Sequence, residues 1–426
     1  MGQPAVTTWL DRASFLCLCG FILLLPVTIA GVEFFASLAC SLFLIRKVVD
    51  ARRGVACGPC VPLRILIPAA AFLAVAAISI LYSEAPRLSI RAFVGKSFLA
   101  ILFFLVVPSI VATRKRLACL FGCFFAAAVV LAFDGFWQLW KGHDLFYMRP
   151  LVDDRIGAAM RHPNDFGAYL IPAVAVALAF TLWAWTTRTV PRPFKHWQTK
   201  LIATLVFMIL CSTLGLTYSR SAWFGFLVAL LVFVLMRRQF MLVCVAGVIF
   251  FGLIFLPLMV SARHVSLVPS GAKVWRTLED IAFNGSGRLT YWGNAVQIIK
   301  DHPFGTGLNT YTVVIKRYSQ IWQAYPHNCY LQMASEIGLS GLAVFLWLLW
   351  SVGRFFVRCH AGTKEDLTAV LLTGLFAGWT GLLFESGFDT TLYSVQLSKF
   401  LWFMMGILVA GVMILEREKG EGTLLK

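Results

Sequence analysis

The sequence predicts an all-α integral membrane protein that crosses the bilayer many times. Of its 426 residues, 59% are apolar and 13% are charged, whereas soluble globular proteins have about 45–50% and about 25%. Apolar runs of about 17–25 residues, long enough to span a bilayer as a helix, recur along the chain. One long polar stretch, residues 261–336, interrupts them. These three observations predict about twelve transmembrane helices and one long helical loop.

The apolar runs are expected to be spans in the order 14–30, 32–46, 65–82, 90–110, 117–140, 165–187, 199–217, 220–236, 239–260, 337–356, 367–385 and 393–415. The chain then divides into a bundle of nine spans over residues 1–260, the polar loop 261–336, three spans over 337–415 and a tail over 416–426. The first run lacks a clear small-residue cleavage site, so we expect it to be retained as a span.

Basic residues in the loops predict the orientation of the bundle. One alternate set of short loops is rich in Lys and Arg, which marks the cytoplasmic side. This set comprises Arg46, Lys47, Arg52, Arg53, Arg64, Arg114, Lys115, Arg116, Arg188, Arg192, Lys195, Lys200, Arg237, Arg238, Arg354, Arg358 and Lys364. Both termini are then cytoplasmic, and the loop 261–336 lies on the outer side. The net charge of +17 therefore indicates membrane topology rather than nucleic-acid binding.

A second group of basic residues falls on the outer side, against the positive-inside trend. It comprises Arg149, Arg155, Arg161, Arg220, Arg263, Lys273, Arg276, Arg288, Lys300, Lys316 and Arg317. One explanation is pairing with acids such as Asp153, Asp154 and Asp301. For the group as a whole, a polyanionic substrate reached from outside explains more. Arg220 stands in a very short turn between two spans, so we expect it to point into an outward-facing cavity.

Two motifs place a His beside an Asn at the start of a helix, Arg161-His162-Pro163-Asn164 and Pro326-His327-Asn328. Asn favours helix N-caps and Pro favours the first helical turn. Helix N-termini also attract phosphate groups. Helix capping is a sufficient explanation for Asn164 and Asn328, but it does not account for the two histidines or for Arg161.

Arg288 begins a helix predicted over residues 288–300, with Leu289, Trp292, Val296 and Ile299 on one apolar face. A cation at a helix N-terminus does not stabilise the helix dipole, whereas a guanidinium makes bidentate contacts with phosphate oxygens. Residues 303–307 form a Gly-rich turn without the Gly-Lys-Ser/Thr ending of a nucleotide-binding loop. A magnesium site would need carboxylates close together, and the outer loops hold two adjacent acidic pairs, Asp153-Asp154 and Glu279-Asp280. No cofactor or metal is expected.

Five motifs in order resemble those of the O-antigen ligase family. They are Arg161-His162-Pro163-Asn164, Tyr218-Ser219-Arg220-Ser221, Gly287-Arg288-Leu289, residues 303–309 and His327-Asn328-Cys329-Tyr330-Leu331. The resemblance covers about residues 155–345 and the twelve-span layout. It implies a GT-C-like glycosyltransferase of the bacterial inner membrane with a periplasmic active site on the loop 261–336. The implied reaction moves O-antigen from undecaprenyl diphosphate to a sugar hydroxyl of lipid A–core, with inversion.

The resemblance also implies roles for single residues. His327 is expected to be the general base, and Arg220 and Arg288 are expected to clamp the diphosphate and stabilise the leaving oxygen. The remaining substrate-binding candidates are Arg161, His162, Asn164, Tyr218, Asn309 and Asn328. The spans would hold the prenyl tail within the membrane lipid.

Three alternatives to the ligase remain. An O-antigen polymerase and a protein O-oligosaccharyltransferase belong to the same superfamily, and no local motif distinguishes their acceptors. A solute transporter is the alternative from another class, because twelve spans is a common transporter count. Transporters usually carry internal repeats, and no repeat relates the two halves of this sequence. The polar residues gather instead in the outer loop, which favours the enzyme.

Overall fold

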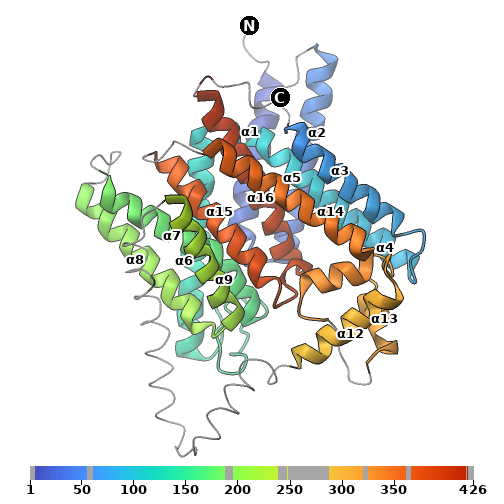
Figure 1. Cartoon of the computed structure of the whole chain (residues 1–426). Coiled ribbons are helices and arrows are strands. Elements are labelled where there is room, and N and C mark those ends of the chain that lie inside the picture. Colours follow the sequence, from blue (N-terminus) through green and yellow to red (C-terminus); the bar gives the residue numbers. More distant parts are fainter. Residues whose placement is uncertain are drawn as a thin grey trace, which may run out of the picture.

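The computed structural model describes residues 5–54, 61–187, 195–237, 287–319, 325–360 and 366–418, together with the single residues Gly247 and Gly420. This part of the chain consists of helices and turns, with two isolated β-bridges and no strand. The predicted all-α class is therefore confirmed. Figure 1 shows long helices side by side in a bundle. We call the end where α1 begins the terminus end, and the end that carries α12 and α13 the insert end.

Ten helical segments are long and apolar enough to cross a membrane. They are α1 (Ala5–Leu24), α2 (Ile29–Arg52), the continuous segment α4 (Pro86–Ala92), η1 (Phe93–Phe98) and α5 (Leu99–Ile110), α6 (Arg114–Lys141), α7 (Pro163–Thr186), α8 (His196–Leu216), α9 (Arg220–Arg237), α14 (Cys329–His360), α15 (Leu367–Glu385) and α16 (Val395–Glu418). α3 (Leu63–Ile78) is apolar but shorter. Together these helices match eleven of the twelve predicted spans, and the remaining one, 239–260, lies outside the described residues except for Gly247.

The centre of the bundle is formed by α7 and α16, because 94% of the apolar window of each is buried. Small residues let the neighbouring helices approach closely. A Cβ added to Gly378 of α15 would lie 2.4 Å from Cα of Pro172 in α7, and one added to Gly381 would lie 2.4 Å from the backbone oxygen of Gly225 in α9. These close approaches pack α15 against α7 and α9. The ends of these three helices that face the insert carry much of the candidate site.

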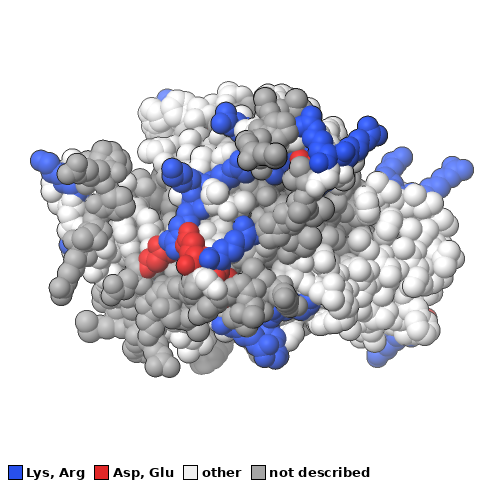
Figure 2. Space-filling model, turned by 90° about the horizontal axis from the view of Figure 1, so that it is seen from above, with Lys and Arg blue, Asp and Glu red and all other residues white. Residues whose placement is uncertain are grey.

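Ion pairs connect the helices at the terminus end. Figure 2 looks onto this end and shows Lys and Arg side chains spread around a small group of acids. Arg114, at the start of α6, pairs with Asp366 at 2.7 Å and with Glu418 of α16 at 2.5 Å. Asp11 of α1 pairs with Arg46 and Arg116. The basic character of this end agrees with the cytoplasmic side that the sequence predicts, and the orientation in a membrane stays a prediction.

The Gly-rich turn of the insert docks on a break in α14. Gly338 has φ 76° and ψ 174°, so it interrupts the helix and leaves carbonyl groups of the preceding turn without their usual helical partners. The backbone N–H of Thr306 donates to Ser335 O at 3.0 Å, and that of Gly307 donates to Glu336 O at 2.8 Å. The Gly-rich turn at residues 303–307 therefore attaches the insert to the bundle and is not a nucleotide-binding loop.

Helix α12 (Arg288–Asp301) confirms the predicted helix over 288–300. Of its predicted apolar face, Trp292 and Ile299 are half-buried, but Leu289 and Val296 are not covered. Ala295 and Ile298 are fully buried, whereas Leu289 is 50% and Val296 39% exposed. The buried pair packs against α13 (Tyr311–Val314) and η3 (Ile315–Arg317), which follow within the insert. The same side of α12 also packs on the start of α14, where Leu331 contacts the buried pair and the Ser335 hydroxyl donates to Ala295 O at 3.5 Å.

Candidate catalytic site

His327 lies at the insert end, just before α14, and contacts an acid from a different part of the chain. Its Nδ1 is 2.9 Å from Oδ1 of Asp389, which stands in the turn between α15 and η4 (Thr391–Tyr393). The ring of Tyr291 in α12 stacks on the imidazole, with centroids 5.9 Å apart. His327 also has φ 49°, a conformation that is rare outside glycine and clusters at functional sites. The imidazole is thus held by three separate segments.

Asp389 is an ionised acid at neutral pH, although it is only 7% exposed. Its carboxylate accepts from the N–H of Thr390 at 2.7 Å and from Nδ2 of Asn164 at 2.6 Å, in addition to His327. Burial acts to raise the pKa of this carboxyl, but the hydrogen bond and charge of His327, with the other two bonds, lower the pKa to about 2. A carboxylate accepts only, so it keeps the proton of a neutral His327 on Nδ1 and leaves the Nε2 lone pair available.

A chain of hydrogen bonds extends from Asp389 to Arg155. The guanidinium of Arg155 donates to Oδ1 of Asn164 at 2.5 Å and to the carbonyl oxygen of Thr217 at 2.8 Å. Because Asn164 accepts from Arg155 through its oxygen, its amide nitrogen is directed to Asp389. The chain therefore runs from Arg155 through Asn164 and Asp389 to His327. It joins loops that precede α7, α9 and α14 to the turn after α15.

A tight turn places Arg155 in this chain. Val152 and Arg155 bond to each other through both backbone groups, at 3.0 and 3.2 Å. The two residues between them, Asp153 and Asp154, have φ 52° and 57°, which is the pattern of a type I′ turn. The sequence marked this acidic pair as one of two adjacent pairs of possible metal ligands. In the structure, these residues instead turn the chain so that Arg155 faces α7.

Three arginines gather beside the hydrogen-bond chain. Burial lowers the pKa of Arg155, the charges of Arg220 and Arg288 lower it further, and Asp153 and Asp389 act in the opposite direction. Arg220 is the first residue of α9, and Arg288 is the first residue of α12, after Gly287 with φ 63°. Arg220 and Arg288 are therefore close enough to Arg155 for their charges to act on it, and such a group of guanidinium groups is suited to a polyanion. The structure thus brings together two of the predicted arginines and adds Arg155.

His162 and Arg161 lie close in sequence but have different surroundings. The His162 ring accepts the N–H of Asn164 at 3.2 Å, so His162 caps α7 and the capping explanation for Asn164 was wrong. Burial lowers the pKa of His162, Asp389 acts to raise it, and the charges of Arg155 and His327 lower it further. His162 therefore belongs to the site. Arg161 is exposed, and the contacts described in this part of the chain do not connect it to the three arginines.

The other three predicted substrate residues have local roles. Tyr218 has φ 48° in the turn before α9, and its ring lies 6.4 Å from that of Trp223. The side-chain oxygen of Asn328 accepts the backbone N–H groups of Tyr330 and Leu331, both at 3.0 Å. Asn328 therefore caps the start of α14, which is the capping role that the sequence suggested. Asn309 accepts from Nζ of Lys96 at 2.7 Å and belongs to a second polar group.

Sequence reasoning missed Asp389 and its support. Glu385, at the end of α15, accepts from Oγ of Ser221 at 3.3 Å and from Oγ1 of Thr391 at 3.0 Å, and so braces the turn that carries Asp389. The available signal was positional, since Asp389 lies in a short turn between two spans on the same predicted side as His327. No spacing rule connects the two residues, because 62 positions separate them.

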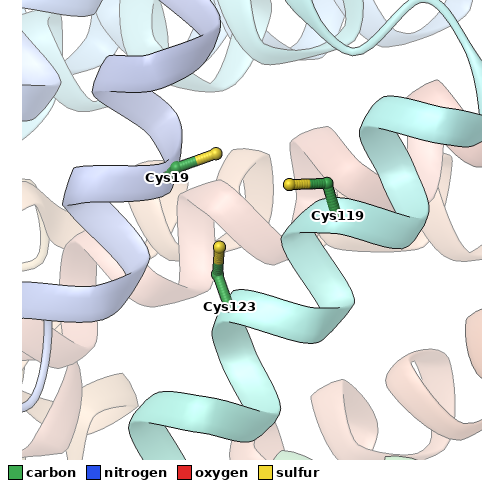
Figure 3. Close-up of side chains that lie close together, drawn as sticks. All are labelled: Cys19, Cys119 and Cys123. Carbon is green, nitrogen blue, oxygen red and sulfur yellow. The ribbon is translucent and has the colours of Figure 1, made fainter.

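Among the described residues, one group of three possible metal ligands has its ligand atoms within 4.8 Å of one another: Cys19 of α1 with Cys119 and Cys123 of α6. Figure 3 shows the three sulfur atoms turned toward one another between the two helices. Structural zinc sites use four ligands, and this group supplies three. Cys119 and Cys123 lie in the first three turns of α6, at the terminus end. The cluster is therefore not part of the His327 site.

Comparison with known families gives a match that covers part of the chain. Residues 205–346 match a family model described as O-antigen ligase. This range contains Arg220, Arg288 and His327, whereas Arg155, Asn164 and Asp389 lie outside it. Comparison with curated proteins gave no match.

Proposed function

We propose, from the match of residues 205–346 to a family model described as O-antigen ligase, that this chain belongs to that family and is the ligase of lipopolysaccharide synthesis. The proposed donor is O-antigen on undecaprenyl diphosphate, and the proposed acceptor is a sugar hydroxyl of lipid A–core. We place the reaction at the periplasmic face of the bacterial inner membrane, with both termini cytoplasmic. The gathering of arginines beside His327 at the insert end supports this location.

His327 acts as the general base in this proposal. Its Nε2 takes the proton of the acceptor hydroxyl while that oxygen attacks the anomeric carbon of the donor. The bond between this carbon and the diphosphate oxygen breaks, so the products are the joined glycolipid and undecaprenyl diphosphate. Attack opposite the leaving group inverts the anomeric centre. Asp389 holds the ring through Nδ1 at 2.9 Å and stabilises the imidazolium that forms.

The arginines stabilise the leaving group. Negative charge develops on the diphosphate oxygen as its bond to the sugar breaks, and Arg220 and Arg288 supply hydrogen bonds and positive charge to it. Arg155 takes the supporting place that the sequence assigned to Arg161, because its guanidinium is held by Asn164 and Thr217 near the other two. A diphosphate neutralised in this way needs no nucleotide for activation.

The observation that carries the proposal is the His327–Asp389 pair beside Arg155, Arg220 and Arg288. The test incubates the purified protein with lipid-linked O-antigen and lipid A–core and measures the joined product. His327→Ala should abolish transfer while the protein remains folded in detergent. The matched control is His302→Ala, because His302 lies in the same insert but faces Glu84, with Nε2 to Oε1 at 3.9 Å. Full activity of His327→Ala removes this residue as the base.

The same assay separates the related reactions. Growth of the glycan on the lipid carrier, without lipid A–core, indicates a polymerase. Transfer to a protein serine or threonine indicates an oligosaccharyltransferase. Uptake of a solute into proteoliposomes without any glycan transfer indicates a transporter.

A further inference from the structure

An apolar cavity lies directly beside the turn that carries Asp389. About 850 Å³ of enclosed and open space lies between η1, α14, α16 and η4. Most of its lining is apolar, for example Phe72, Phe345 and Trp402. Leu392 and Tyr393, which also line it, follow Asp389 by three and four residues. The cavity and the catalytic pair therefore share one short segment.

The charged groups inside the cavity balance one another. Nζ of Lys399 pairs with Glu33 at 2.8 Å. Nζ of Lys96 donates to the side chain of Asn309 at 2.7 Å, and Glu336 accepts the backbone N–H of Asn309 at 2.8 Å. Two lysines are thus matched by two glutamates, and each of these four side chains has a hydrogen-bond or ion-pair partner within the protein. The interior therefore suits a neutral, apolar chain rather than a phosphate group.

The mouth of the cavity is basic. Gly95 lines the cavity and also lines an open hollow on the surface of α4, together with Arg87 and Arg91. These two arginines are one helical turn apart and exposed, and they form no ion pair with a carboxylate in the described part of the chain. Ile90 and Val94, 52% and 49% exposed, line the same hollow. The hollow thus combines two cations with apolar surface at the entrance to an apolar interior.

We infer that this cavity holds an acyl chain of the acceptor glycolipid, with phosphate groups of that lipid on Arg87 and Arg91. The inference rests on the proposed function, because a transferase between two membrane lipids needs two amphiphile sites. Arg155, Arg220 and Arg288 serve the donor diphosphate. Arg87 and Arg91 form a separate cationic pair on α4, and the cavity behind them reaches the segment next to Asp389. An acylated acceptor seated there is brought to His327 by its own lipid anchor.

The test fills the cavity mouth without disturbing the fold. A Cβ added to Gly95 meets no atom within 4 Å, so Gly95→Trp introduces a large side chain at the mouth without a backbone clash. Gly122→Trp is the matched control, since a Cβ at Gly122 of α6 also meets no atom within 4 Å and Gly122 lines neither hollow. Each protein is assayed with intact lipid A–core and with the same acceptor after removal of its acyl chains.

We expect the wild type and Gly122→Trp to prefer the intact acceptor. Gly95→Trp should raise KM for the intact acceptor by at least about tenfold, which corresponds to about two methylene groups losing their apolar surroundings. Its KM for the deacylated acceptor and for the donor should stay unchanged. Equal kinetics of Gly95→Trp and Gly122→Trp overturn the inference. An increase confined to the donor KM also overturns it, because the cavity then holds the prenyl tail.

Two further measurements separate this inference from the proposed function. Arg87→Glu with Arg91→Glu changes only exposed side chains, and it should raise KM for the intact acceptor most strongly at low salt. Lipid A itself, which lacks the core sugars, should raise the unfolding temperature of the wild type and of Gly122→Trp but not of Gly95→Trp. If the wild type transfers no glycan, the proposed function fails while the lipid A measurement still tests the cavity. Equal stabilisation of all three proteins refutes the acyl-chain site.

Discussion

Replacing Asp389 by Asn tests whether the hydrogen-bond chain sets the tautomer of His327. In the native chain, Asp389 accepts from His327 at 2.9 Å and from Asn164 at 2.6 Å. Arg155 holds the Asn164 oxygen, so the amide nitrogen of Asn164 must face position 389. An Asn at position 389 has one accepting and one donating end. It therefore either places two NH₂ groups against each other or donates to Nδ1 of His327 and forces the proton to Nε2.

The expected loss is large because both arrangements impair the base. A proton on Nε2 removes the lone pair that accepts the acceptor's proton, and the lost carboxylate no longer stabilises the imidazolium. In serine-protease triads, the equivalent change lowers kcat by about 10⁴-fold. His327 is 42% exposed on its side chain, so water screens part of the effect. We therefore expect kcat to fall by about 10³-fold, or about 4 kcal/mol of transition-state stabilisation.

The assay compares initial rates of transfer for the wild type, Asp389→Asn and the double variant Asn164→Asp/Asp389→Asn. In the double variant, the carboxylate at position 164 accepts from both Arg155 and the new amide. The oxygen of that amide then accepts from Nδ1 of His327. The double variant should transfer at least about tenfold faster than Asp389→Asn, because the direction of each hydrogen bond is restored although position 389 still lacks its charge. A single variant within about threefold of the wild type, or a double variant no better than the single one, refutes the reasoning.

Three other predictions concern the arginines, metal ions and pH. Arg288→Lys should lower turnover nearly as much as Arg288→Ala, because Lys lacks the bidentate geometry; near wild-type turnover would instead indicate simple charge attraction. Transfer should persist in EDTA, and loss of activity that magnesium restores would contradict a metal-free mechanism. The pKa of Asp389 is lowered to about 2 in the folded protein, so its contribution of about 2 kcal/mol is present above the ordinary carboxyl pKa of about 4 and is lost as the pH falls toward 2. The unfolding temperature of Asp389→Asn should consequently change less than that of the wild type between pH 5 and 3, and equal slopes would contradict this assignment.

The sequence identified the polar loop, His327, Arg220 and Arg288 because each breaks a strong local pattern. Arg220 stands between two apolar spans, and His327 and Arg288 stand where helices begin. Local pattern could not distinguish Arg155 from Arg161, which lie six residues apart in one loop. The turn at Asp153-Asp154 decides which of them reaches Asn164. Arg155 is therefore a tertiary finding.

The buried face of α12 shows the same limit. Periodicity proposed a face that included Leu289 and Val296, yet these two are exposed and the helix buries Ala295 and Ile298 against α13, η3 and the start of α14. A periodic pattern predicts that a helix has an apolar side, but it does not indicate which element packs against this side. At the end of a bundle, where a helix is covered on only one narrow strip, several exposed apolar residues remain.

Composition alone determined the membrane class and most of the spans of this protein. Burying uninterrupted apolar runs of this length in lipid is so favourable that the spans form wherever the runs occur. Only the tertiary structure brought Asp389 to His327 and placed a cavity beside them. Residues 62 positions apart meet there because α14 and α15 return the chain to the insert end. Contacts of that kind depend on which helices pack together, and no local spacing in a sequence encodes that choice.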